Sequence, residues 1–528
     1  MTQGTKADLY GLLKRTAEAY PDGEAVICND LHYSYRQLKE RVDRLAQSLG
    51  SMGLHNEDKI AIIHKNCHRY LEAYFAAAKI GAVLVPINYR LAEQDFIYIL
   101  HDAQARILIA QPELIRCLPR RREDLPGLES IILTSPEKGE AWEESIAFDS
   151  LFEGVAPPEE PAIPATELSA AQIYYTSGTT GRPKGVVLTH RNNLAHAERA
   201  IRELCLTKND RWIHVSPMFH LADAWAVWAI TQTAGTHVMI PCFEPKAVLE
   251  AISRHGVTVS NFIPTMLNIL VNLNDIDDYD LSSLRLIMSG GAPIAKEVVR
   301  KVIEIFDCDY IQTYGLTETS PFLTMSILKE DMKNLPFEER LKIMVTTGRP
   351  FHDVRLKVVR ENGQQVADNN QEVGEIIAKG ETITPGYWNL PEETSKRIVE
   401  GWLHTRDLAV VNPEGYVTIV DRKDDVILTG GENVYSIEVE DALYGHPGIL
   451  EAAVIGLPDP LWGEKVTAIL VPKEERKLTE DEVIQFCKEK MAAFKAPKHV
   501  IFTQNLPKTG SAKIFKYKLR EKFRPKES

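Results

Sequence analysis

The segment with the clearest chemical signal is residues 174–185, which contains three glycines, three threonines and one lysine. The backbone N–H groups and hydroxyls of such a loop can surround a polyphosphate, and glycine permits the positive φ angles and close backbone approach that this requires. A flexible surface hairpin is the simpler alternative for the same composition. The combination of glycine, threonine and Lys184 favours a loop that binds nucleotide phosphates.

The residues on either side of this loop distinguish it from the phosphate loop of kinases and GTPases. Residues 173–175 read as a strand, and 185–189 are apolar and β-branched, so the chain is expected to leave the loop as another strand. A Walker A loop leaves as a helix, with Ser or Thr directly after its lysine. Here Gly185 and Val186 follow Lys184, which argues against that class.

Composition limits the function classes that fit this chain. It has 528 residues, 44% of them hydrophobic, and a net charge of -13. These values indicate a globular protein of several domains and argue against a nucleic-acid-binding surface, although not against a small anionic substrate. Seven cysteines without a C-x-x-C pair are typical of reduced thiols. With no apparent signal peptide or transmembrane segment, we expect a cytoplasmic protein.

Hydrophobic spacing predicts the elements that position the loop. Residues 35–49 have helical spacing, 59–63 and 82–86 read as buried strands, and helical residues 70–79 lie between those strands. This order is typical of a β-α-β unit in a parallel sheet.

The same alternation returns later in the chain. It predicts a strand over 284–288, a tight turn over 289–293 and an amphipathic helix over 294–306. A strand, glycines and a helix N-terminus in this order suit a polar or anionic ligand.

The pattern changes near residue 345. Val354, Leu356 and Val358 alternate with polar residues, and 374–378 reads as a strand, which together predict antiparallel β structure. After the charged run 421–425, the chain becomes a shorter, lysine-rich α/β segment. The expected fold class is therefore α/β, with a large N-terminal domain (1–422) of parallel α/β subdomains plus an antiparallel β subdomain, and a small α+β C-terminal domain (423–528).

Four motifs in this order together resemble those of the acyl-adenylate-forming superfamily, which includes acyl-CoA synthetases, luciferases and the adenylation domains of peptide synthetases. They are the glycine-rich loop, 314–318 (Tyr-Gly-Leu-Thr-Glu), 401–407 (Gly-Trp-Leu-His-Thr-Arg-Asp) and 507–513 (Pro-Lys-Thr-Gly-Ser-Ala-Lys). The resemblance extends over nearly the whole chain. It implies that a carboxylate attacks the α-phosphorus of ATP to give acyl-AMP and pyrophosphate, and that a thiol then displaces AMP.

The resemblance implies specific catalytic roles. Lys513 would bridge the carboxylate and the α-phosphate; without the motif it would be a solvated lysine in a basic tail. Ala512 precedes it where the family usually has glycine. Glu318 would bind Mg²⁺ together with substrate phosphates, and Thr317 would hydrogen-bond the α-phosphate.

The resemblance also implies an ATP site. Tyr314 would stack on adenine, although an aromatic residue before glycine is more often part of a core. Asp407 would accept hydrogen bonds from the ribose and Arg422 would add a donor; otherwise they would be a surface pair. The remaining implied contacts are Thr176, Ser177, Gly178, Thr179, Thr180, Gly181 and Lys184 at the β- and γ-phosphates, and Gly291, Ala292, Pro293, Gln312, Thr313 and Gly315 as further nucleotide-binding positions.

Near the C-terminus, the resemblance implies a mobile domain that rotates about Asp424. Gly430 and Gly431 would line a tunnel for the thiol, although a plain β-turn explains them as well. Trp462, Phe494 and Lys498 resemble positions that contact the nucleotide of coenzyme A, whereas Ala496 stands where some relatives carry arginine. Coenzyme A is therefore the expected acceptor. A stand-alone enzyme that loads a carrier protein and a catalytically impaired nucleotide-binding relative are the alternatives, and a homodimer is compatible with the family.

The segment after residue 217 is expected to shape the acyl pocket. His220 resembles an aromatic gate between the acyl site and the thiol tunnel, although an unmatched histidine would more often belong to the core. No lysine or arginine occurs in 212–245, so a second carboxylate would lack a counter-ion and would meet Asp223. Bulk from Trp225, Trp228, Phe262 and Thr313 favours a medium-length, alicyclic or aromatic monocarboxylate as the substrate.

Overall fold

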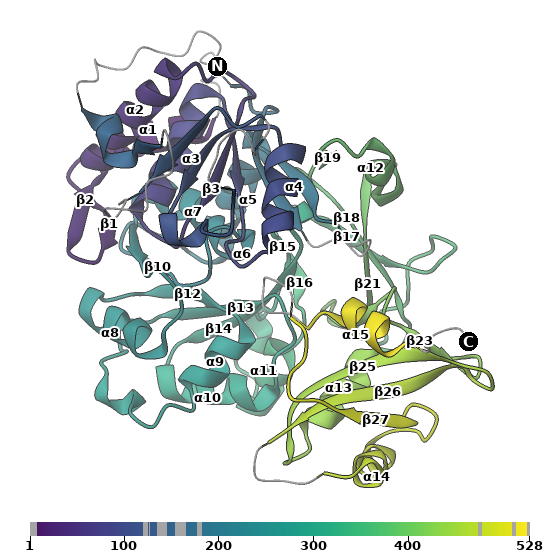
Figure 1. The fold of residues 1–528 in the computed structure, drawn as a ribbon. Helices are drawn as coiled ribbons and strands as arrows, with labels where there is room; N and C mark the ends of the chain where they lie inside the picture. The colour runs from purple at the N-terminus through teal and green to yellow at the C-terminus, as the bar shows by residue number, and fades with distance from the viewer. Residues whose placement is uncertain are drawn as a thin grey trace. The chain divides into compact units, whose positions relative to one another are not determined.

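The computed structural model describes residues 8–119, 125, 127–134, 145–153, 165–176, 182–473, 478–508 and 514–524. The chain divides into two compact units (Figure 1). Unit 1 comprises Met1–Arg355 and Ala378–Leu403, and unit 2 comprises Leu356–Ile377 and His404–Ser528. The domain boundary expected near residue 422 is the point about which the C-terminal domain would rotate, and it stays a prediction.

A nine-stranded sheet forms one half of unit 1. Its central strands pair in parallel, and the pairs β1–β2, β14–β15 and β15–β16 are antiparallel. In sheet order the strands are β16 (Arg349–Pro350), β15 (Phe322–Met325), β14 (Asp309–Gly315), β13 (Leu286–Gly290), β12 (Val259–Phe262), β10 (Arg211–His214), β11 (Thr236–Met239), β1 (Glu24–Cys28) and β2 (Leu31–Ser34).

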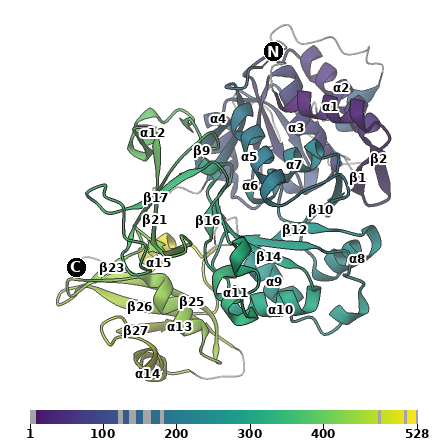
Figure 2. The same ribbon diagram turned by 180° about the vertical axis from the view of Figure 1, so that it is seen from behind.

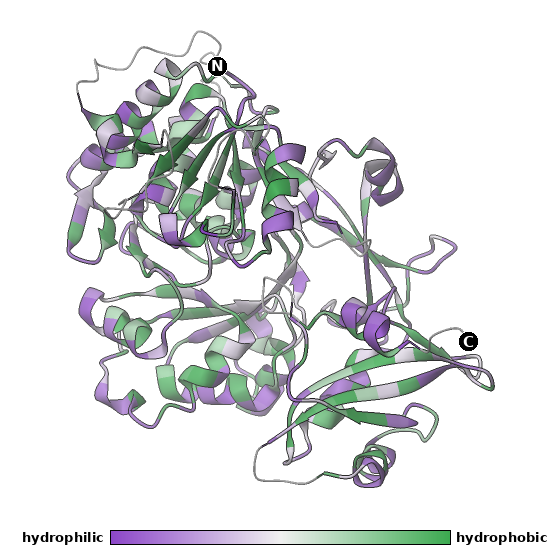
Figure 3. Ribbon diagram, viewed as in Figure 1, coloured by the Kyte–Doolittle hydropathy of each residue, from purple (hydrophilic) through white to green (hydrophobic). Residues whose placement is uncertain are grey.

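An eight-stranded sheet forms the other half, with hydrophobic residues along its central strands (Figure 3). Strands β3 to β8 pair in parallel, whereas β9 pairs antiparallel with both β8 and β19. In sheet order the strands are β19 (Gly386–Tyr387), β9 (Lys184–Thr189), β8 (Ala170–Thr176), β4 (Val83–Pro86), β3 (Lys59–Ile63), β5 (Ala105–Ala110), β6 (Ser130–Leu133) and β7 (Ile146–Ala147).

Helices separate and cover these two sheets. Helix α3 contacts β4 of one sheet and β1 of the other, so it belongs to a layer between them. That layer holds α1 (Leu9–Ala19), α2 (Tyr35–Ser51), α3 (His68–Ile80), α5 (His190–Glu203), α6 (Leu221–Ala224) and α7 (Ala226–Gln232). Helix α4 (Glu93–Asp102) packs on the outer face of the eight-stranded sheet. The nine-stranded sheet is covered by α8 (Pro245–His255), α9 (Pro264–Leu270), α10 (Lys296–Phe306) and α11 (Phe337–Met344) (Figure 2).

Sequence features account for these helices. Ser34 and Gln37 form a capping box at the start of α2, and Gly81 ends α3 in the left-handed conformation. The apolar stripe of α10 supplies Val299, Val302 and Phe306 to the core. The short 3₁₀ helices are η1 (Pro112–Leu114), η3 (Phe148–Phe152), η4 (Ile276–Asp278), η5 (Thr317–Thr319) and η6 (Glu330–Met332).

A five-stranded sheet contains β17 (Arg355–Val359), β18 (Gly374–Lys379), β21 (Trp402–Val411), β20 (Ile398–Val399) and β22 (Val417–Arg422). The chain passes from one unit to the other within β17, β18 and β21. Strand β21 pairs antiparallel with β20 and with β22. Helix α12 (Pro391–Arg397) precedes β20.

The C-terminal part of unit 2 is an α+β layer around a second five-stranded sheet. Helices α13 (Ser436–Tyr444) and α14 (Glu480–Lys490) cover one face, and α15 (Lys516–Phe523) packs on the other. The strands are β24 (Glu432–Val434), β23 (Ile427–Thr429), β26 (Gly463–Pro472), β25 (Ile449–Asp459) and β27 (His499–Phe502).

The structure confirms the expected α/β class, including the β-α-β unit β3–α3–β4 and the strands on both sides of the glycine-rich loop. One local prediction was wrong. Ser289 and Gly290 end strand β13 instead of forming a turn, because Gly290 pairs with Thr313, and α10 begins only at Lys296. In the described part of the chain, no helix is long and apolar enough to cross a membrane.

Gly315 offers a test of how tightly the 316–321 turn is held. A Cβ at this position would lie 1.8 Å from the carbonyl oxygen of Pro321. We expect Gly315→Ala to lower the free energy of unfolding by about 1–3 kcal/mol, because the backbone must shift to relieve this contact. Chemical denaturation measures the change.

Gly50→Ala is the matched control, because a Cβ there meets no atom within 4 Å and the residue lies in helix α2. It should leave the stability unchanged or raise it by up to about 1 kcal/mol. Equal stability of the Gly315→Ala protein and the wild type would show that the turn is not closely packed.

Candidate active site

The glycine-rich loop connects two antiparallel strands in the structure. Strands β8 and β9 pair in register, with Thr176 opposite Lys184. The Thr176 hydroxyl donates to the Lys184 carbonyl oxygen at 3.5 Å. The predicted phosphate-binding residues that lie outside the described residues are Ser177, Gly178, Thr179, Thr180 and Gly181.

Lys184 extends from the start of β9 to helix α12. Its Nζ lies 2.7 Å from Glu393 Oε2, and its ammonium is 6.0 Å from the centroid of the Tyr387 ring. Lys396 contacts the other oxygen of the same carboxylate at 2.9 Å. Hydrogen bonds from Lys184 and Lys396 lower the pKa of Glu393 to about 2, so this carboxylate is ionised at neutral pH.

The turn after β14 carries Thr317 and Glu318 in the 3₁₀ helix η5. Glu318 is buried, and its Oε1 accepts a hydrogen bond of 2.7 Å from the Tyr387 hydroxyl. The Thr384 amide donates to the Glu318 carbonyl oxygen at 2.9 Å. Burial, followed by the charge of Glu318, raises the pKa of Tyr387, which keeps the phenol protonated as a donor.

The residues expected around adenine follow the ends of two neighbouring parallel strands. Gly291, with φ of 85°, Ala292 and Pro293 are exposed directly after β13, and Tyr314 is half-buried near the end of β14. Gln312 Nε2 donates to the Ala292 carbonyl oxygen at 3.2 Å, which ties the two segments together. The carboxyl ends of neighbouring parallel strands are where ligands bind in open α/β sheets.

His220 caps the short helix α6, where its Nδ1 accepts a hydrogen bond from the Ala222 amide at 3.3 Å. Asp223, three residues after His220, is fully buried. Its oxygens contact Trp212 Nε1 at 3.2 Å and His214 Nδ1 at 2.6 Å. In the sequence, Asp223 was the group that a second substrate carboxylate would meet; in the structure, both of its oxygens already have ring-nitrogen partners.

Trp225 and Trp228 are both fully buried. The rings of Trp225 and Phe322 pack edge to face, with their centroids 5.0 Å apart. The rings of Trp228 and Tyr74 pack in the same way, with their centroids 5.5 Å apart. These contacts give both tryptophans a role in core packing. Thr313 is also buried, and its hydroxyl donates to the Ser289 carbonyl oxygen at 3.1 Å.

In unit 2, Asp407 on β21 lies opposite Arg422 on β22. Arg422 Nε donates to Asp407 Oδ1 at 3.1 Å; the carboxylate is buried, whereas the Arg422 side chain is 53% exposed. Asp424 accepts a hydrogen bond of 3.0 Å from Arg406 Nε. The contact between Asp407 and Arg422 thus joins a buried acceptor to a solvent-facing donor.

Gly430 and Gly431 form the turn between β23 and β24, with φ angles of 59° and 87°. A Cβ on Gly430 would lie 3.0 Å from the Trp462 ring, so the glycine permits this close packing. Lys498 Nζ lies 5.7 Å from the centroid of the same ring and donates to the Ala493 carbonyl oxygen at 3.1 Å. Trp462 and Phe494 are 44% and 40% exposed.

Family profiles match nearly the whole chain. The profile of the AMP-binding enzyme matches residues 13–388, and that of the AMP-binding enzyme C-terminal domain matches 438–513. The chain belongs to the AMP-binding enzyme family. A feruloyl-CoA synthase from Amycolatopsis sp is 35% identical to this AMP-binding enzyme over 512 residues, covering 96% of this chain and 98% of that protein.

Solved structures agree with this family. An anthranilate CoA ligase in complex with anthranoyl-AMP has a TM-score of 0.87 and 26% identity, covering 99% of this chain and 98% of that chain. An o-succinylbenzoate coenzyme A synthetase from Bacillus subtilis in complex with ATP and a magnesium ion has a TM-score of 0.82 and 28% identity, covering 98% and 99%. This AMP-binding enzyme is an acyl-CoA ligase of the AMP-forming type, which uses ATP, Mg²⁺ and coenzyme A.

The acidic groups of this AMP-binding enzyme fit a magnesium ion that arrives with its substrate. Among the described residues, no group of three His, Cys, Asp or Glu side chains could hold a metal ion on its own. Glu318 is a single buried carboxylate, and Mg²⁺ is commonly held by one or two carboxylates plus substrate phosphates and water.

The sequence did not single out Tyr387 and Glu393, which contact predicted site residues, or Arg397, which contacts Tyr387. Glu393 pairs with Lys184, and Tyr387 contacts both Glu318 and Arg397. Tertiary structure brings these three residues to the site, and no local sequence motif identifies them. Lys513 and its neighbour Ala512 lie outside the described residues.

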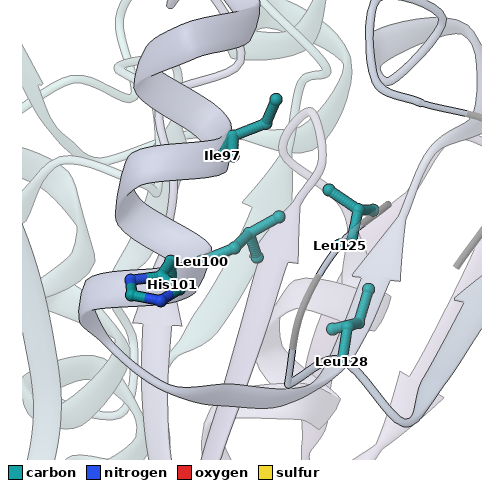
Figure 4. Close-up of a pocket in the computed structure, with 5 residues that line it drawn as sticks. All are labelled: Ile97, Leu100, His101, Leu125 and Leu128. Carbon is teal, nitrogen blue, oxygen red and sulfur yellow. The ribbon is translucent and has the colours of Figure 1, made fainter. Parts of the chain in front are cut away.

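A small apolar pocket elsewhere in unit 1 is separate from these residues. It lies between helix α4 and residues Leu125 and Leu128, and His101 is the polar side chain among the described residues that line it (Figure 4). The pocket is lined by Ile97, Leu100, His101, Leu125 and Leu128. None of the predicted site residues contributes to it.

Proposed function

We propose that this acyl-CoA ligase activates a medium-length, alicyclic or aromatic monocarboxylate. The observation that carries this proposal is the position of Thr313: its buried hydroxyl lies against Gly290, where a Cβ would be only 2.3 Å from Thr313 Oγ1. The Thr313 side chain narrows the space at the ends of β13 and β14. The similarity to a feruloyl-CoA synthase and an anthranilate CoA ligase, both named for aromatic acids, supports this substrate class.

We infer that the residues of unit 1 bind the ATP phosphates and magnesium. Lys184 and the 176–181 segment hold the β- and γ-phosphates, Thr317 holds the α-phosphate, and Glu318 supplies the carboxylate ligand for Mg²⁺. The magnesium ion neutralises phosphate charge while it is bound. The 2.7 Å contact of Lys184 with Glu393 supports this role, because it shows an ammonium held at the base of the loop by a solvent-accessible partner.

In this proposal, one set of groups contacts the adenine and another set contacts the ribose. Tyr314 and the 291–293 segment contact adenine, with Gln312, Thr313 and Gly315 supporting them from β14. Asp407 accepts hydrogen bonds from the ribose hydroxyls, with Arg422 as an added donor. The burial of Asp407 supports this role, because its carboxylate is fixed in place by strand pairing rather than by a flexible loop.

We propose that Lys513 supplies the charge for adenylation. The first half-reaction brings two anions together, so most of its catalysis comes from positioning and from positive charge at the reacting oxygens. Rotation about Asp424 would then remove Lys513, and Gly430 and Gly431 would line the path of the thiol. His220 would act as the gate between the acyl site and that path. The expected cytoplasmic location and a homodimer stay predictions.

The proposal for Lys513 predicts a split between the two half-reactions. Lys513→Ala should slow acyl-AMP formation by about 10²- to 10³-fold, because the stabilising charge is lost in that step alone. Transfer from supplied acyl-AMP to coenzyme A should change by less than about threefold. Pyrophosphate release and thioester formation, measured separately, report the two steps.

Lys518→Ala is the matched control for this experiment, because it removes a nearby charge from the same basic tail. It should leave both half-reactions near the wild-type rate. Equal losses in both half-reactions for Lys513→Ala would contradict the assigned role.

The substrate proposal predicts that Thr313→Gly widens the acyl site. The kcat/KM for acids bulkier than benzoate should rise by about tenfold relative to benzoate, because a side chain that excludes them is removed. A panel of benzoate, cyclohexane carboxylate and fatty acids of increasing length gives the measurement. Thr313→Ser, which retains the hydroxyl bonded to Ser289, should show a smaller change, and an unaltered acid profile in Thr313→Gly would place the acyl group elsewhere.

The exposed Trp462 predicts a contribution to coenzyme A binding alone. Trp462→Ala should raise the KM for coenzyme A by about tenfold, because a base-stacking surface is lost, while pyrophosphate release in the first half-reaction stays unchanged. Phe502→Ala removes another exposed aromatic ring of unit 2 and should leave this KM unchanged. A normal KM in the Trp462→Ala enzyme would remove this residue from the proposed site.

A further inference from the structure

Tyr387 lies at the centre of a hydrogen-bonded chain that ends at Glu318. Its hydroxyl donates to Glu318 Oε1 at 2.7 Å and accepts from Arg397 Nε at 3.3 Å. A phenol that receives a hydrogen bond from a cation becomes a stronger donor, since consecutive hydrogen bonds polarise one another. The carboxylate oxygen in this contact is therefore held by a polarised, charge-assisted bond.

The backbone around Tyr387 fixes the position of its ring. Tyr387 pairs with Val186 between β19 and β9, and its amide donates to Thr394 Oγ1 at 2.9 Å. Gly386 allows α12 to approach closely, because a Cβ there would lie 2.5 Å from Thr394 Cγ2. The hydroxyl therefore reaches Glu318 from a strand that is anchored on both sides.

Helix α12 presents two groups to the site, one helical turn apart. Glu393 pairs with Lys184, and Arg397, four residues later, contacts Tyr387. Arg397 Nη1 is buried and has no hydrogen-bond partner. Within the described residues Arg397 forms no ion pair, and it contacts this site through the hydrogen bond to the Tyr387 hydroxyl.

The turn that carries Glu318 is held from the same segment. The Thr384 amide donates to the Glu318 carbonyl oxygen at 2.9 Å, and the Ser320 hydroxyl donates to the Thr382 carbonyl oxygen at 2.7 Å. The backbone of Glu318 is thus fixed by residues 382–384, and its side chain by Tyr387. Among the hydrogen bonds of the described residues, none involves the other carboxylate oxygen, Oε2.

We propose that Tyr387 is a positioning residue for metal-dependent adenylation: its hydroxyl, oriented by Arg397, fixes the Glu318 carboxylate in the rotamer that binds Mg²⁺. This inference rests on the proposed role of Glu318. Groups that hydrogen-bond to metal ligands orient those ligands, and their loss typically weakens metal binding without removing a ligand. Tyr387 does not touch the substrate in this proposal.

Metal binding to the enzyme–nucleotide complex tests this inference directly. The probe is Mn²⁺, followed by its paramagnetic resonance signal, with a non-hydrolysable α,β-methylene analogue of ATP and no acid present. Tyr387→Phe should weaken Mn²⁺ binding by about 10-fold, because the ring remains and only the orienting hydroxyl is lost. AMP binding without metal, measured by calorimetry, should stay at the wild-type value.

A matched control removes a similar hydrogen bond away from the site. The Tyr10 hydroxyl donates to Asp43 Oδ1 at 2.6 Å, so Tyr10→Phe also deletes a phenol-to-carboxylate bond in unit 1. It should leave Mn²⁺ affinity unchanged. Arg397→Gln should weaken Mn²⁺ binding in the same direction as Tyr387→Phe but by a smaller factor, about threefold, and provides a second route to the answer if one variant folds poorly.

Combining variants tests the role of Tyr387 separately from the role of Glu318. If Tyr387 acts through Glu318, Tyr387→Phe should cause no further loss in a Glu318→Gln background. Weaker Mn²⁺ binding in Glu318→Gln with unchanged binding in Tyr387→Phe would overturn the inference alone. Unchanged binding in Glu318→Gln would overturn the assigned role of Glu318 and the inference with it.

Discussion

The pairing of β19 with β9 is the constraint on which the chemistry of unit 1 depends. Strand β9 begins at Lys184, and the antiparallel register places Tyr387 beside Val186. The Trp388 amide extends this contact, donating to the Gly185 carbonyl oxygen at 2.7 Å. Strand β19, although distant in sequence, thereby places Tyr387 next to Lys184. The hydroxyl of this tyrosine contacts Glu318. Loss of this pairing would separate the proposed phosphate-binding and metal-binding groups.

The charges at this junction allow Lys184 to change partners at low cost. Glu393 contacts both Lys184 and Lys396, at 2.7 and 2.9 Å, and is ionised because these two ammonium groups hold its pKa at about 2. In the proposed phosphate-binding role of Lys184, its ammonium would leave Glu393, which would retain Lys396 as a partner. Ion pairs of partly exposed side chains are weak, and a phosphate carries more charge than a carboxylate. The ion pair with Glu393 is thus compatible with the phosphate-binding role that we propose for Lys184.

Residue types and hydrophobic spacing predicted the strands and helices whose formation depends on neighbouring residues. The strands beside the glycine-rich loop follow from β-branched residues 185–189, and the helices of the β-α-β unit follow from their apolar spacing. The turn expected at Ser289 and Gly290 was wrong because pairing with β14, a tertiary contact, extends β13. Tyr387 and the histidine partner of Asp223 could not be predicted, since their contacts depend on strand order rather than on neighbouring residues. The motifs therefore identify candidate ligands, whereas the groups that orient them require the structure.

Packing in unit 2 gives a physical reason for one departure from related sequences. Ala496 is fully buried in the core with Val466 and Val500, so its side chain faces away from solvent. An arginine here would have to reach the surface from a closely packed position, at the expense of the core. Lys498 lies instead against the exposed Trp462 ring, where a flexible ammonium can follow a phosphate without the fixed geometry of a guanidinium. The proposed coenzyme A surface thus depends on an exposed aromatic ring that packs closely against Gly430 and on a movable point charge.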